Sequence, residues 1–191
     1  MVVDTRALET RPNATYQDVI DAPKHKVAEI IDGTLYLSPR PPFGAARAKQ
    51  NLLLRLWGPY DRGEGGPGGW WLLREPEFYL ETDVLVPDLV GWRRDRIPVL
   101  PDASGIDLPP DWACEALTPV TRALDLTSKR SLYARAGIPH LWQIDDEARL
   151  LEAFTLASGQ WRLVAALCDD QEVCLAPFEA VSFSLSELWD D

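Results

Sequence analysis

A single carboxylate interrupts the apolar run Val84-Leu85-Val86-Pro87-Asp88-Leu89-Val90. A second carboxylate lies in the apolar run Trp112-Ala113-Cys114-Glu115-Ala116-Leu117. Runs of this length and composition predict strands, over residues 84–92 and 112–117. Because side chains alternate between the two faces of a strand, each carboxylate shares its face with apolar residues: Val84, Val86 and Val90 for Asp88, and Ala113 and Leu117 for Glu115. An unpaired charge there would cost several kcal/mol, so both carboxylates must have partners.

A lysine is expected to face these carboxylates. The segment Thr121–Ala136 predicts a helix, which Gly137 and Pro139 end. On this helix Lys129 shares its stripe with the apolar residues Leu132, Tyr133 and Ala136, at spacings of three, four and seven. A lysine inside an apolar stripe points toward the sheet that the helix covers. Asp125, one turn earlier, shares this side and is an alternative partner for Lys129.

Asp88, Glu115 and Lys129 allow two interpretations. They can form a buried ion-pair network with no further role. Two carboxylates on adjacent strands can equally hold a hard cation, because Mg²⁺ is bound through one or two carboxylates plus waters and substrate phosphate. A nearby lysine would then position or activate the attacking water and stabilise the developing charge. A glycosidase carboxylate pair also fits the residue types but leaves Lys129 without a role.

The rest of the chain predicts a mixed α/β order, with helices packed on a central sheet. Asp32-Gly33 lies between the apolar runs Val27–Ile31 and Leu35–Leu37, which predicts an N-terminal β-hairpin. Further helices are expected over residues 15–22, 43–60 and 184–191, and further strands over 70–73, 77–80, 141–144, 150–156 and 161–166. Long loops are expected over 61–69 and 93–111. Residues 1–14 are expected to form a loose leader, and residues 15–191 a single domain.

Composition favours a globular protein, because 46% of the 191 residues are hydrophobic and 26% are charged. The net charge of −11 opposes binding to a polyanion, since nucleic-acid-binding proteins usually carry a basic face. Basic residues gather only locally, at Arg93, Arg94 and Arg96, and at Arg122, Lys129, Arg130 and Arg135. Such clusters are usually solvated surface.

Several classes of protein are disfavoured. No apolar stretch approaches the ~18 residues of a membrane span, and residues 1–11 lack the apolar core of a signal peptide. Three cysteines without metal-ligand spacing indicate reduced thiols, so we expect a cytoplasmic protein. His25 and His140 are the only histidines, which is too few for a His/Cys zinc cluster. No glycine-rich phosphate loop, nucleophile elbow or dinucleotide fingerprint is present.

Five stretches of sequence carry a resemblance to a known family. They are Glu29–Pro39, Val86–Trp92, Asp111–Pro119, Asp125–Lys129 and Tyr133–Asp145. In this order and spacing the chain resembles the putative restriction endonuclease family of bacteria, a branch of the PD-(D/E)xK nuclease superfamily. The resemblance covers roughly residues 15–165. It implies a restriction-endonuclease-like fold, which is a mixed central sheet flanked by helices, with the N-terminal hairpin attached.

The resemblance also implies a site. Asp88 and Glu115 would be the ligands of Mg²⁺ or Mn²⁺, and the protein would cleave the phosphodiester bonds of nucleic acid, with DNA favoured. The superfamily motif has a lysine two residues after the glutamate, where this chain has Leu117, so Lys129 on the following helix would replace it. Glu29 would be an additional acidic residue of the site, or else an exposed residue of the hairpin. A homodimer is compatible with this resemblance.

The chain departs from the family pattern at two places, and one of these departures supports an alternative function. Relatives often have His-Ala-Arg at the start of the long helix, where this chain has Ala45-Ala46-Arg47. Thr118 stands where a serine is common. The missing histidine and the acidic charge favour a catalytically silent nuclease-fold module that binds a protein partner or nucleic acid. A metal-dependent hydrolase of another phosphate ester would use the same ligands.

Overall fold

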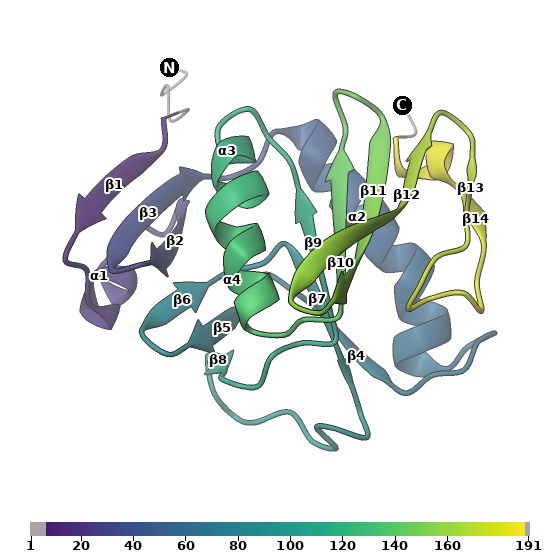
Figure 1. Cartoon of the computed structure of the whole chain (residues 1–191), viewed down its shortest axis with the longest axis horizontal. Coiled ribbons are helices and arrows are strands. Elements are labelled where there is room, and N and C mark those ends of the chain that lie inside the picture. The colour runs from purple at the N-terminus through teal and green to yellow at the C-terminus, as the bar shows by residue number, and fades with distance from the viewer. Residues whose placement is uncertain (1–6, 190–191) are drawn as a thin grey trace.

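The computed structural model describes residues 7–189, which form two six-stranded sheets and one two-stranded sheet (Figure 1). The first sheet has the strand order β1 (Glu9–Pro12), β3 (Thr34–Pro39), β2 (Lys26–Ile31), β6 (Asp83–Leu85), β5 (Glu77–Leu80) and β8 (Gly105–Ile106). The second sheet has the order β12 (Gln160–Cys168), β11 (Leu150–Ala157), β10 (His140–Asp145), β9 (Trp112–Ala116), β7 (Leu89–Arg93) and β4 (Trp70–Arg74). Strands β13 (Glu172–Val173) and β14 (Phe183–Ser184) form the third sheet.

Helices cover both faces of the second sheet. Helix α2 (Phe43–Leu56) runs behind this sheet in Figure 1 and packs Ala48 and Leu52 into a core with Cys114 and Trp142. The opposite face is covered by one continuous helical segment, made of α3 (Arg122–Leu124), a π-helical turn (Asp125–Lys129) and α4 (Arg130–Arg135). Both β5–β8 and β9–β10 pair in parallel, whereas the other strand pairs are antiparallel. The expected mixed α/β fold is confirmed.

The predicted N-terminal hairpin is confirmed as β2 and β3. Asp32 and Gly33 connect the strands with φ angles of 48° and 71°. Two consecutive positive φ angles match the right-handed twist of a hairpin, which is why Asp-Gly is favoured there. A short helix, α1 (Tyr16–Ile20), precedes the hairpin and begins with the expected capping box of Thr15 and Asp18.

The expected continuous strand over residues 84–92 is wrong. The run is divided between β6 in the first sheet and β7 in the second, and residues 86–88 cross from one sheet to the other. Pro87 explains the break, because a residue without an N–H cannot pair within a central strand. Asp88 therefore does not share a strand face with Val84 and Val86, but lies where the two sheets meet.

The expected single central sheet is also wrong, because the hairpin belongs to the first sheet, which is separate from the second. The first sheet begins with β1, inside the segment expected to be a loose leader. All four β1 residues are exposed, so main-chain pairing with β3 holds the strand and no apolar pattern marks it. The part of the expected leader at residues 1–6 lies outside the described residues.

Three smaller features differ from the sequence-based expectation. Helix α2 stops at Leu56 and a π-helical turn, Trp57–Arg62, follows it to Gly63, whose φ is 71°. The loop over 93–111 contains β8. The last helix is a 3₁₀ turn, Leu185–Leu188, and residues 190–191 are not described. No helix among residues 7–189 is both long and apolar enough to cross a membrane.

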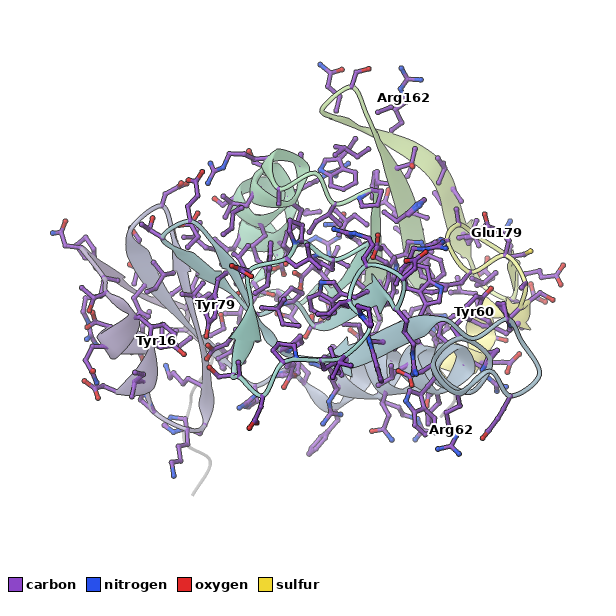
Figure 2. All side chains as sticks on the ribbon, turned by 90° about the horizontal axis from the view of Figure 1, so that it is seen from below. Tyr16, Tyr60, Arg62, Tyr79, Arg162 and Glu179 are labelled. Atoms are coloured by element: carbon purple, nitrogen blue, oxygen red, sulfur yellow. The ribbon has the colours of Figure 1, made fainter. Side chains whose placement is uncertain are left out.

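The C-terminal segment contributes to the hydrophobic core that α2 covers. Phe178 lies between β13 and β14, and its ring packs against Tyr60, Trp70, Trp112 and Trp142 at centroid distances of 4.7–5.7 Å. Figure 2 shows Tyr60 beside Glu179, and the backbone N–H of Ala180 donates to the Tyr60 hydroxyl at 2.8 Å. The tryptophans in apolar runs are thus mainly core residues, as expected from the sequence.

Candidate active site

Asp88 and Glu115 meet where β7 and β9 pair. Asp88 directly precedes β7, and Leu89 lies opposite Cys114 in the antiparallel register. The backbone N–H of Ala116 donates to Asp88 Oδ2 at 2.8 Å, and that of Asp88 lies 3.4 Å from Glu115 Oε2. The two carboxylates therefore come from neighbouring strands, as the sequence predicts, although Asp88 reaches this place through the crossing at Pro87.

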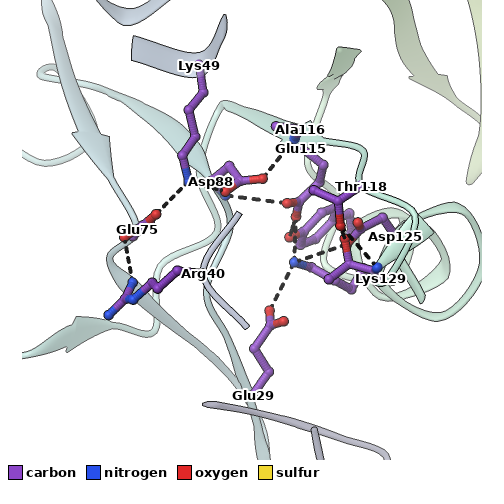
Figure 3. Close-up of polar contacts among 12 residues, drawn as sticks. Glu29, Arg40, Lys49, Glu75, Asp88, Glu115, Ala116, Thr118, Asp125 and Lys129 are labelled. Carbon is purple, nitrogen blue, oxygen red and sulfur yellow. Dashed lines mark hydrogen bonds and ion pairs between the residues drawn. The ribbon is translucent and has the colours of Figure 1, made fainter. Parts of the chain in front are cut away.

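Lys129 points toward the sheet, as its position in the apolar stripe predicts. Its side chain is 3% exposed, and Nζ lies 2.9 Å from Glu115 Oε1 and 3.0 Å from Glu29 Oε1 (Figure 3). Asp125 Oδ1 is 3.5 Å away. The sequence argument offered Asp125 as an alternative partner, but Lys129 contacts the strand carboxylate and Asp125 together.

Glu29 is buried, so an exposed hairpin position is wrong for this residue. It lies on β2, where its Oε1 accepts a hydrogen bond of 2.9 Å from the backbone N–H of Val86. Glu29 thus lies on the first sheet, close to the place where the two sheets meet, and it contacts Lys129 of the helical segment. Glu29, Asp88, Glu115 and Lys129, the four residues predicted for the site, lie together.

Burial and charge set the protonation of this cluster. Burial raises the pKa of Glu115 well above its usual range; Lys129 opposes this shift, and nearby carboxylates add to it. Burial likewise raises the pKa of Asp125 to about 6 against the effect of Lys129. Burial alone would lower the pKa of Lys129, but Glu115 and Glu29 outweigh it and keep the ammonium charged. Tyr133 donates a short hydrogen bond to Glu115 Oε1.

The sequence analysis missed a second buried lysine. Lys49, on α2, is 3% exposed, and its Nζ lies 2.6 Å from Asp88 Oδ1 and 2.5 Å from Glu75 Oε1. Glu75 also pairs with Arg40 at 3.1 Å. The signal was present, because Lys49 interrupts the buried stripe of α2, which consists of Ala45, Ala48, Leu52 and Leu56. The same reasoning that identified Lys129 applies to it.

Glu75 gives no such signal. It follows β4 in a turn, with a φ of 52° that is uncommon for a residue with a side chain. Its backbone N–H donates to the Asp88 carbonyl at 3.1 Å. This contact, which no sequence period marks, places the Glu75 carboxylate beside Lys49.

A pocket opens above the cluster, with about 50 Å³ of free volume. Its lining consists of the charged residues Glu29, Glu75, Asp88, Glu115, Asp125 and Lys129, together with uncharged residues: Val27, Ser38, Pro39, Pro41, Val86, Ala116, Thr118 and Thr121. None of Arg93, Arg94, Arg122 and Arg130 lines it. The lining is thus neither the basic ring that a polyanion favours nor a fully acidic one.

The donor set fits a partly hydrated divalent cation. Five carboxylates, namely Glu29, Glu75, Asp88, Glu115 and Asp125, surround Lys49 and Lys129, and Arg40 pairs with Glu75, which leaves an excess of two negative charges when all are ionised. Glu115 Oε2 has only the long 3.4 Å contact from a backbone N–H, so it remains open to a ligand. Among residues 7–189 no three His, Cys, Asp or Glu side chains form a ready ligand set. Mg²⁺ does not need one, because it retains waters.

Comparison with known proteins places this architecture in the class of nuclease-like α/β proteins. The chain is similar to a putative nuclease belonging to DUF820 from Anabaena variabilis ATCC 29413, with a TM-score of 0.74, covering 92% of this chain and 97% of that one. The sequences are 18% identical, so this likeness shows the fold alone. The chain belongs to the Uma2 family, described as putative restriction endonucleases, whose model matches residues 14–186. No curated protein matches the chain.

The family match confirms the resemblance found in the sequence. It covers the hairpin, the helical segment that carries Lys129, and every strand of both six-stranded sheets except β1. All the residues that line the pocket therefore lie within the matched range.

Proposed function

We propose that this protein is a Mg²⁺- or Mn²⁺-dependent endonuclease that hydrolyses phosphodiester bonds of nucleic acid, with DNA as the favoured substrate. The observation that carries the proposal is the excess of carboxylates around Lys129 in one pocket, at the junction of the two sheets. Membership of a family described as putative restriction endonucleases supports the reaction class.

Asp88 and Glu115 are the proposed metal ligands. A bound divalent cation would bind the substrate phosphate and lower the pKa of an attacking water. Ala116 holds Asp88 through its backbone N–H, and Tyr133 holds Glu115 through its hydroxyl. Both ligands are thus fixed before any cation arrives, which reduces the cost of ordering them.

Lys129 is proposed to stabilise the negative charge that develops on the phosphate. It lines the pocket, beside the proposed ligands Asp88 and Glu115. Glu29 and Asp125 contact the same ammonium and would orient it. In this proposal Glu29 acts through Lys129 and through the Val86 backbone, and does not itself bind the metal.

A catalytically silent module that binds a protein partner is the second candidate. It is favoured by the complete pairing of Lys129, whose ammonium already contacts three carboxylates in the described structure. Ala45, which replaces the histidine common among relatives, supplies no polar group at the start of α2.

Cleavage assays separate the candidates. Plasmid DNA, single- and double-stranded oligonucleotides, RNA and a simple phosphate ester are incubated with Mg²⁺, Mn²⁺ or a chelator. We expect metal-dependent cleavage by the wild type, and a loss of at least ~100-fold in Glu115→Gln. Glu152→Gln is the matched control, since Glu152 lies two strands away on β11 and outside the pocket. Cleavage by Glu115→Gln at the wild-type rate would exclude this site, and Mn²⁺ binding without cleavage of any substrate would support the silent module.

A further inference from the structure

Each of the two central carboxylates has its own buried lysine. Lys129 pairs with Glu115 and lines the pocket, whereas Lys49 pairs with Asp88 and does not line it. Figure 3 shows Lys49 reaching Asp88 from α2, on the side away from Lys129. Substrate in the pocket therefore meets Lys129, and Lys49 can act only through Asp88 and Glu75.

We infer that Lys49 sets the divalent-cation affinity of the site, because its ammonium remains next to Asp88 when a metal ion binds the same carboxylate. This inference rests on the proposed function, because it assumes that Asp88 is a metal ligand. In the metal-free protein, Lys49 offsets the repulsion between Asp88 and Glu75. Once a divalent cation binds Asp88, the same ammonium repels it.

The position of Asp88 does not depend on the charge of Lys49 alone. Its Oδ1 accepts from Lys49, but its Oδ2 accepts independently from the Ala116 backbone N–H at 2.8 Å. Removing the Lys49 charge therefore leaves Asp88 anchored to β9. The stem of Lys49 packs in the apolar stripe of α2, so a methionine of similar length keeps the packing.

The size of the effect follows from Coulomb's law. An ammonium and a divalent cation that share one carboxylate are about 5 Å apart, close enough to repel even at a water-like dielectric constant. We expect Lys49→Met to bind Mn²⁺ at least ~10-fold more tightly than the wild type. Lys49→Arg keeps the charge and is expected to bind Mn²⁺ within about threefold of the wild type.

The test measures Mn²⁺ binding by calorimetry or by the electron-spin signal of free Mn²⁺, together with the melting temperature without metal. Without metal, Lys49→Met should have a lower melting temperature than the wild type. Saturating Mn²⁺ should raise the melting temperature of Lys49→Met by more than it raises that of the wild type. Arg55→Met is the matched control, because Arg55 is an exposed cation of the same helix and pairs with Glu187. It should leave Mn²⁺ affinity unchanged.

Equal or weaker Mn²⁺ binding by Lys49→Met, with binding by the wild type intact, would overturn this inference alone. A wild type that binds no Mn²⁺ would instead overturn the proposed metal site. If Lys49→Met does not fold, Glu75→Gln and the double variant Lys49→Met/Glu75→Gln replace it. The double variant removes one charge of each sign, and we expect it to bind Mn²⁺ at least ~10-fold more tightly than Glu75→Gln.

Discussion

At the scale of single residues, Lys129 has more carboxylate partners than any other described lysine. The sequence presented a catalytic lysine and a structural counter-ion as alternatives. The contacts are compatible with both roles, because the three carboxylates that contact this ammonium beside the pocket also depend on it for charge balance. Loss of Lys129 should therefore affect stability and the proposed cleavage together.

Lys129→Met keeps the side-chain stem and deletes the charge. Because it leaves Glu29, Glu115 and Asp125 buried without their common partner, we expect the free energy of unfolding to fall by about 3–5 kcal/mol without metal. Cleavage should slow at least ~100-fold where the variant is folded. Urea denaturation and single-turnover assays measure the two effects. Lys24→Met, which removes an exposed lysine at the surface, is the control, and a Lys129→Met protein with wild-type stability and rate would remove Lys129 from the site.

Asp88→Asn should behave in the opposite way. It removes one of five carboxylates around two lysines, and Lys49 keeps Glu75 as a partner. The melting temperature without metal should therefore stay equal or rise. The stabilisation by Mn²⁺ should disappear, because a ligand stabilises the native state only if it binds there. Thermal scans with and without Mn²⁺ test both points, and an unchanged Mn²⁺ shift in Asp88→Asn would exclude Asp88 as a ligand.

Sequence patterns located Glu29, Asp88, Glu115 and Lys129, because each is a charge inside an apolar run or matches a family motif. Lys49 has the same pattern on α2, but its partner Asp88 is 39 positions away and on another element. Glu75 lies in a turn, where no period applies. Residues whose place depends on a turn conformation are thus the ones that periodicity cannot find.

At the scale of elements, most of the strands and helices form where the hydrophobic patterns of the sequence predict them. The division of the strands between the sheets does not follow from those patterns. The β9 alternation is as predicted, with Cys114 in the core under α2 and Ala113 in the core under α4. The division of residues 84–92 between two sheets depends on Pro87 and on pairing with distant strands. A run of apolar residues cannot reveal which neighbours it will have, so the number of sheets was beyond prediction.

The C-terminal segment gives an element-scale prediction. Phe178 is 1% exposed and its ring contacts four aromatic side chains from α2's π-turn, β4, β9 and β10. Phe178→Ala should cost about 3–5 kcal/mol of unfolding free energy, because it leaves a cavity among rigid rings. Phe43→Ala is the control, since Phe43 is 96% exposed and should change stability by no more than about 0.5 kcal/mol. Equal losses in the two variants would mean that the ring cluster adds nothing to stability.

At the scale of the whole molecule, five of the six arginines in the basic clusters of the sequence pair with carboxylates within the fold. Arg93, Arg94 and Arg96 pair with Asp95, Asp61 and Asp111, and Arg122 and Arg135 pair with Asp145 and Asp83. Arg130 lies over the Phe154 ring at 3.9 Å. The net charge of −11 is therefore not balanced by a free basic face formed by these residues.

This pairing predicts a weak dependence of nucleic-acid binding on salt. Each phosphate that a protein neutralises adds about −0.9 to the slope of log affinity against log salt for duplex DNA. Because five of the six clustered arginines are already paired with carboxylates, we expect a slope of about −3 or shallower. Fluorescence anisotropy with Glu115→Gln, which prevents cleavage, measures it between ~50 and ~200 mM salt, the range over which such slopes are compared.

Asp145→Asn provides the matched variant for this measurement. It releases Arg122, whose neighbour Thr121 lines the pocket, from an ion pair of 2.5 Å. If internal pairing limits binding to phosphate, this variant should bind more tightly and steepen the slope by about one. Circular dichroism checks that it remains folded. A slope steeper than about −5 in the parent protein would show that many free cations contact the phosphates, and would contradict the neutralisation inferred from the ion pairs.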